Sequence, residues 1–142
     1  MAGNATARRE SRRQSHRAAR WAGAVLCLAV AVIHVIDQGG ITATRDPSYI
    51  GVAYHVLEIA ALVAALLLLL GLARPGWLLA IGVAVGPLLG YLLSRGPGLP
   101  DYRDDIGNWT EPLGLVSLAV EALLLLLAVP LFVRNVRGPV SS

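Results

Sequence analysis

The stretch Gly51-Val52-Ala53-Tyr54-His55-Val56-Leu57-Glu58 opens the longest apolar run of the chain, which extends from Ile50 to Leu72. An apolar run of this length spans the hydrocarbon core of a bilayer as one helix. Its two acidic or basic side chains, His55 and Glu58, are three positions apart, so a helix carries them on one face. Because ionisable groups inside a membrane segment are costly, we expect both to face the protein interior and to have partners there.

Three further apolar runs predict three more membrane helices, and polar or Gly/Pro-rich segments separate all four. The predicted helices are residues 21–37, 50–72, 77–94 and 109–133, within one membrane domain of residues 21–134. A chain of 142 residues with 56% hydrophobic residues and a mean hydropathy of +0.64 is too apolar for an ordinary soluble domain. The fold class that follows is an all-α membrane protein, a bundle of four transmembrane helices.

The two ends of the chain are polar. Residues 1–20 carry six arginines and no apolar periodicity, so we expect a disordered cytoplasmic tail that touches anionic lipid head groups. Nucleic-acid binding is disfavoured because no aromatic residue precedes Trp21. Residues 135–142 are expected to form a second, short cytoplasmic tail.

The start of the fourth helix is also predicted. Thr110 is expected to cap it, with Pro112 in its first turn.

The arginines predict the orientation. With the N-terminus inside, nine of the twelve arginines lie on the inner side and three on the outer side, which satisfies the positive-inside rule. Both termini are therefore predicted to be cytoplasmic, in a multi-pass protein of the bacterial cytoplasmic membrane. The absence of lysine, beside abundant Ala, Gly, Val and Leu, indicates a GC-rich coding bias.

This topology brings most of the ionisable residues of the helices to the outer half of the bundle. Imidazole and carboxylate ligands together suit zinc, iron, manganese or copper, so one reading of this cluster is a metal site. The candidate ligands are His34, Asp37, His55, Glu58 and Glu111. Glu121 lies deeper, near the bilayer midplane, with Ser117 as a candidate partner. The candidate partners of His55 and Glu58 are Tyr54, Tyr91, Ser94 and Arg95.

Other readings of the cluster remain open. The main reading is that the polar groups hold helices together in a structural or accessory membrane subunit, with a partner protein or a second copy, and metal binding is the alternative to it. Proton or cation movement through Glu58 and Glu121 is a third reading, and haem or quinone binding by His34 and His55 is a fourth. An enzyme is disfavoured because the chain has no hydrolase or phosphate-loop motif, and Cys27, its single cysteine, cannot form an internal disulfide.

The third helix carries glycines at strict four-residue spacing, Gly82, Gly86 and Gly90. Such a ridge of small residues lets another helix approach closely, so we expect helix packing there, within the bundle or in a homodimer. A thinned wall beside a pore is the alternative. Pro87 is expected to kink this helix.

Four segments together resemble small four-helix membrane proteins of high-GC bacteria. They are His34-Val-Ile-Asp-Gln-Gly-Gly, His55-x-x-Glu58, Tyr91-Leu-Leu-Ser-Arg-Gly-Pro-Gly-Leu-Pro and Glu111-Pro-Leu-Gly-Leu. The resemblance covers residues 33–129 and implies a fold and a membrane location, but no activity. It also marks Arg95 and Glu111, which flank one outer loop, as a candidate ion pair.

Overall fold

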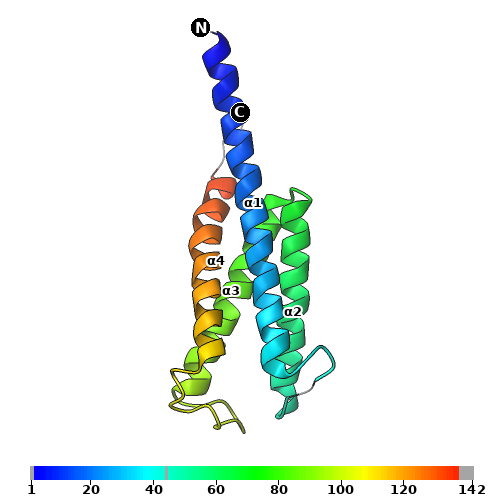
Figure 1. The fold of residues 1–142 in the computed structure, drawn as a ribbon, viewed down its shortest axis with the longest axis vertical. Helices are drawn as coiled ribbons and strands as arrows, with labels where there is room; N and C mark the ends of the chain where they lie inside the picture. Colours follow the sequence, from blue (N-terminus) through cyan, green and yellow to red (C-terminus); the bar gives the residue numbers. More distant parts are fainter. Residues whose placement is uncertain (1, 44, 138–142) are drawn as a thin grey trace.

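The computed structural model describes residues 2–43 and 45–137 and contains four α-helices (Figure 1). These are α1 (Ala2–Gln38), α2 (Ser48–Leu69), α3 (Ala73–Arg95) and α4 (Pro112–Val136). All four are long and apolar enough to cross a membrane, as judged from length and composition. The predicted all-helical, four-helix architecture is confirmed within this part of the chain. Residues 138–142 of the predicted C-terminal tail lie outside it.

Helix α1 begins far earlier than expected. The sequence predicts a disordered tail before Trp21, whereas the structure continues the helix back to Ala2. Alanine, arginine, glutamine and glutamate, which dominate residues 2–20, are good helix formers. Because the apolar part of α1 already supplies a nucleus, each further residue adds a hydrogen bond without a new nucleation cost. Figure 1 shows this extension protruding beyond the other helices.

Helix α4 begins differently from the prediction. The capping residue is Glu111, not Thr110, and its carboxylate accepts hydrogen bonds from the backbone N–H groups of Leu113 (3.0 Å) and Gly114 (2.6 Å). A carboxylate at this position satisfies free N–H groups and interacts favourably with the helix dipole. Pro112 lies in the first turn, as predicted, where its missing N–H costs nothing.

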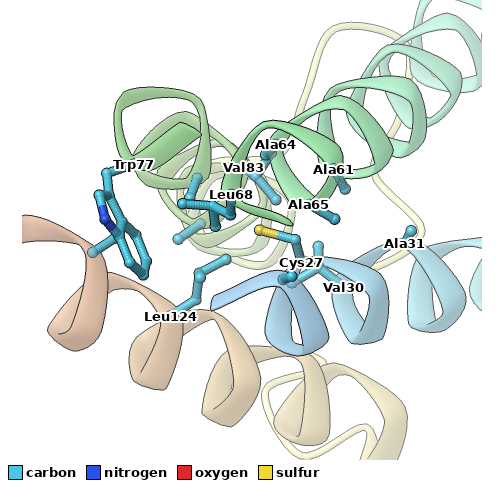
Figure 2. Packing of buried hydrophobic residues seen from close by; sticks show 14 residues of the cluster. Cys27, Val30, Ala31, Ala61, Ala64, Ala65, Leu68, Trp77, Val83 and Leu124 are labelled. Carbon is cyan, nitrogen blue, oxygen red and sulfur yellow. The ribbon is translucent and has the colours of Figure 1, made fainter. Parts of the chain in front are cut away.

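The hydrophobic core occupies one half of the bundle, near the chain ends and the short turn between α2 and α3. It is built mainly from alanines, which let the helix backbones approach closely. Trp77 of α3 is the largest fully buried side chain. Figure 2 shows the side chains of Cys27, Leu68 and Leu124 gathered beside Trp77 in this interior. The core closes this half of the bundle, which we call the terminal half.

The four helices are arranged as two hairpins that diverge in the other half, which we call the loop half. Helix α1 contacts the three other helices, while α2 and α4 do not contact each other. Figure 1 shows α3 running from beside α2 at the terminal end to beside α4 at the loop end. The loops 39–47 and 96–111 both lie at the loop end. The separation of α2 from α4 leaves room for a cavity between the hairpins.

The outward faces of the helices are apolar along most of their length. Large exposed hydrophobic side chains occur on every helix, for example Val32, Ile59, Leu89 and Leu126. A soluble monomer rarely exposes so much continuous apolar surface. This surface is the kind that lipid hydrocarbon covers.

Candidate ligand-binding cavity

A cavity of about 730 Å³ lies in the loop half, and all four helices and the loop 96–111 contribute to its lining. Its volume is within the range of small-molecule binding sites, about 300–1,000 Å³. Most lining side chains are apolar, and the polar ones are gathered at the closed end and at the mouth. We call the closed end, next to the hydrophobic core, the floor.

The floor of the cavity carries a buried carboxylate. Glu121 of α4 is only 1% exposed, and its Oε1 accepts a hydrogen bond from the Ser117 hydroxyl at 2.5 Å. The sequence-based pairing of Ser117 with Glu121 is thus present. His34 of α1 lies opposite, with Nε2 at 3.8 Å from the same oxygen. A charge-bearing group this deep in an apolar helix is costly unless other groups satisfy it.

The proton on His34 can be assigned from its second contact. Nδ1 lies 2.9 Å from the backbone carbonyl of Val30, and a carbonyl only accepts, so Nδ1 carries the hydrogen. In the neutral ring Nε2 is then an acceptor, and it faces Glu121 Oε1 beyond hydrogen-bond distance. Two acceptors that face each other are brought into a favourable arrangement by a donor between them. A proton or the cationic group of a ligand fits this requirement.

One wall of the cavity is the glycine ridge of α3. Gly82, Gly86 and Gly90 all line the cavity, and a Cβ atom built at any of them would meet no atom within 4 Å. The prediction that this ridge packs against another helix of the bundle is therefore wrong. The ridge faces the cavity because a different side of α3, which carries Ala80, Val83 and Ala84, packs against the hydrophobic core. The homodimer version of the prediction is untested.

The mouth of the cavity is bordered by a network of hydrogen bonds and ion pairs. On the side of α1 and α2, the Tyr54 hydroxyl donates to the Asp37 carboxylate. Arg45 donates to the Asp37 backbone carbonyl and places Nη2 3.3 Å from the carboxylate. The three side chains thereby join the end of α1, the following loop and α2.

The same network continues across the loop 96–111 to the second hairpin. Arg45 Nη1 donates to the Tyr102 hydroxyl at 3.3 Å, and Tyr102 donates to Asp105 at 2.9 Å. Burial, and then the hydrogen bond to Asp105, raise the pKa of Tyr102, which keeps its hydroxyl a donor. Arg95 completes the connection, with Nη1 3.7 Å from Asp105 and Nη2 3.6 Å from Glu111. The sequence-based Arg95–Glu111 pairing is therefore present.

Arg95 is held in place by several groups. Its guanidinium lies 3.9 Å from the centre of the Tyr91 ring, and Nε donates to the Asn108 carbonyl at 2.9 Å. Nη1 also donates to the Ser94 hydroxyl at 3.1 Å. Only 12% of the side chain is exposed. This positioning explains why one arginine can link α3, the loop and the start of α4.

The predicted metal site is not confirmed. Among the described residues, no three His, Cys, Asp or Glu side chains are grouped so that they could hold a metal ion. Of the five candidate ligands, His34, Asp37 and Glu111 line the cavity at separate points, each with its own partner. His55 and Glu58 do not line it.

Glu58 takes part in the contact between α1 and α2. Glu58 accepts a hydrogen bond from Gln38 at 2.7 Å, whereas His55 Nδ1 is buried with no partner among the described residues. The cavity face of α2 instead carries Tyr54 and Leu57. The expected partners for this pair, Tyr54 and the residues at the end of α3, are therefore wrong.

Sequence reasoning missed three residues of the mouth, Arg45, Tyr102 and Asp105. All three are in loops, and Tyr102 and Asp105 are in a Gly/Pro-rich loop whose shape is not encoded by any periodic pattern. The clustering of acidic residues next to Arg103 and Tyr102 was the available signal. The resemblance to membrane proteins of high-GC bacteria stays a prediction. No protein-family model, curated protein or solved structure matches this chain.

Proposed function

We propose that this chain is a multi-pass membrane protein whose cavity binds a small, largely apolar molecule that carries a cationic or hydrogen-bond-donating group. The observation that carries the proposal is the pair of facing acceptors at the floor, Glu121 Oε1 and His34 Nε2, at 3.8 Å. The apolar walls match the body of such a molecule, and the acceptors match its polar group.

The orientation of the cavity follows from the arginine distribution. Arg74 and Arg134 lie at the terminal end with the basic part of α1, and Arg45, Arg95 and Arg103 lie at the loop end. By the positive-inside rule the terminal end is cytoplasmic, so the cavity faces the outside of a bacterial cytoplasmic membrane. Binding of a molecule from the outer side or the outer leaflet is the consequence.

Binding is favoured over conduction by the closed core. Beyond Glu121 the terminal half is filled by Cys27, Leu68, Trp77 and Leu124, which are all less than 2% exposed. Their only polar groups are the Cys27 thiol, a weak donor and acceptor, and the Trp77 indole N–H, which cannot accept a proton. Among the described residues of the core no carboxylate or imidazole continues from the cavity floor toward the terminal end, which favours binding over conduction.

Tetraphenylphosphonium, an apolar cation, is the probe for the first experiment. We would measure its binding to the full chain in lipid nanodiscs by equilibrium dialysis, with protein-free nanodiscs as the blank. Glu121→Gln keeps the shape of the side chain and removes its charge, so it should weaken binding at least tenfold, because two opposite unit charges about 6 Å apart attract each other by about 3 kcal/mol at an effective dielectric constant of about 20. Triphenylphosphine oxide, which is neutral and of similar shape, should show no dependence on Glu121.

Glu58→Gln is the matched control, because Glu58 is the other carboxylate in the middle of a membrane helix but does not line the cavity. It should leave probe binding unchanged. Equal binding by wild-type protein and protein-free nanodiscs would contradict the proposal. If Glu121→Gln only lowered the melting temperature, the floor would be a structural contact, and an accessory subunit with a membrane partner would be the better reading.

A further inference from the structure

The basic extension of α1 carries its charge on one side. At 3.6 residues per turn, its six arginines fall within about half of the helix circumference, and His16 falls in the same half. The opposite half carries Glu10, Gln14 and small residues. The described residues of this segment form none of the ion pairs found in the structure. Such a concentration of unpaired positive charge attracts an anionic partner.

A second pocket, of about 600 Å³, lies where this extension meets the terminal end of the bundle. Five of its lining residues belong to α1, four of them basic, and the other four come from the start of α3 and the end of α4. The lining residues are Arg13, His16, Arg17, Ala19, Arg20, Ala73, Trp77, Leu131 and Asn135. No carboxylate is among them. The pocket is separate from the cavity in the loop half.

Arg20, at the end of the basic extension, lies against the turn between α2 and α3. Its guanidinium is so close to the α2–α3 turn that a Cβ added at Gly71 would lie 2.6 Å from Nη1. Its Nε is buried and has no hydrogen-bond partner among the described residues. A buried guanidinium N–H without a partner is costly, and an anion beside it would remove that cost.

The start of α3 adds a second attraction for an anion. Ala73, its first residue, lines the pocket, and Leu72 before it supplies no side-chain cap. Ala73 and Gly76 already use their N–H groups in hydrogen bonds to the carbonyls of Gly71 and Leu72, and Pro75 has none, so the start of α3 contributes the positive end of its dipole. The guanidinium groups of the α1 arginines are the donors that a phosphate would use.

We propose that this pocket binds the phosphate group of an anionic phospholipid. A lipid is favoured over a soluble phosphate compound because Trp77 and Leu131 form the side of the pocket next to the apolar spans, where acyl chains would continue. The positive-inside rule places the pocket at the cytoplasmic leaflet, which is the leaflet rich in anionic lipids. The expected effect is a defined lipid at this site, beyond a general attraction to the membrane surface.

The test uses native mass spectrometry of the full chain in detergent with added phosphatidylglycerol, and phosphatidylcholine as the zwitterionic comparison. Arg13→Gln/Arg17→Gln removes two pocket charges from exposed positions. At roughly fivefold per arginine near an anionic lipid, it should weaken phosphatidylglycerol binding about 30-fold. The matched control Arg8→Gln/Arg12→Gln removes the same charge from the same helix outside the pocket, and should weaken it fivefold at most.

Three outcomes decide the matter. Loss confined to the pocket variant, with unchanged phosphatidylcholine binding, supports a defined site. Equal losses in both variants would overturn it and leave only diffuse attraction. Competition by millimolar inorganic phosphate as strong as that by phosphatidylglycerol would overturn the lipid assignment, because the pocket would then prefer a soluble anion. Since Arg13 and Arg17 are exposed, both variants should keep the helix content of the wild type, which circular dichroism verifies.

Discussion

Alanine substitutions at two helical glycines are expected to change the stability of the protein differently, because the two sites are packed differently. Gly23 of α1 lies against the core, where an added Cβ would be 2.6 Å from two atoms of the Trp77 ring and 3.0 Å from Leu68. Gly86 of α3 faces the cavity, where an added Cβ would meet no atom within 4 Å. The two substitutions add the same methyl group to a helix, so their difference measures packing alone.

The magnitude follows from two opposing effects. Replacing glycine by alanine inside a helix gains up to about 1 kcal/mol through helix propensity. Overpacking a closed core costs about 1–3 kcal/mol, and Trp77, which the new methyl group would meet, is 1% exposed. Gly86→Ala should therefore be neutral or stabilising. The free energy of unfolding of Gly23→Ala should be roughly 1–3 kcal/mol lower than that of Gly86→Ala.

The measurement is reversible unfolding of each variant in detergent micelles with increasing sodium dodecyl sulfate, followed by circular dichroism. The reasoning fails if Gly86→Ala destabilises the protein as much as Gly23→Ala. That result would mean that the ridge packs against a helix. Chemical cross-linking would then show whether that helix belongs to a second copy, as the homodimer version of the ridge prediction requires.

The remaining predictions concern the mouth and the cavity wall. Arg95→Gln and Glu111→Gln should be non-additive by about 0.5–1 kcal/mol in a double-mutant stability cycle, because the pair is partly buried; additive effects would mean that the two groups do not interact. Tyr102→Phe should cost about 1 kcal/mol in unfolding free energy through the lost hydrogen bond to Asp105, and protease digestion of the loop should accelerate; unchanged digestion would mean that this bond does not hold the loop. Gly86→Leu should keep the fold but lower tetraphenylphosphonium affinity, since its side chain projects into the cavity; undiminished affinity would place the probe elsewhere.

The number of helices and, apart from the start of α1, their approximate bounds could be predicted because the length of an apolar run is matched to the thickness of the bilayer. The Ser117–Glu121 and Arg95–Glu111 contacts could also be predicted. The first is a pair of residues four positions apart on one helix, and the second joins the two ends of one loop. Short-range geometry of this kind depends little on how the helices pack.

The rotation of each helix about its axis could not be predicted, and it decided most of the site. The apolar helices have no polar side that would indicate which face lies inside, so His55 could be assigned to either neighbour of α2. Neither His55 nor Glu58 lines the cavity, and Glu58 instead accepts a hydrogen bond from Gln38 of α1. The glycine ridge was misassigned for the same reason, since small residues suit both a close helix contact and a cavity wall.

The difference between the two halves of the bundle follows from its connections. α2 and α3 are joined by a turn of only three residues, 70–72, which holds their ends together, and alanines fill the narrow space beside it. At the opposite end the longer loops 39–47 and 96–111 allow the hairpins to separate. Polar side chains in the space between the separated hairpins need hydrogen-bond partners. At the mouth, the contacts from Arg45 through Tyr102 and Asp105 to Arg95 provide them. At the floor, Glu121 and His34 retain acceptors that face each other, and a donor between them, either a proton or the cationic group of a ligand, would satisfy both, which is the basis of the proposed binding site.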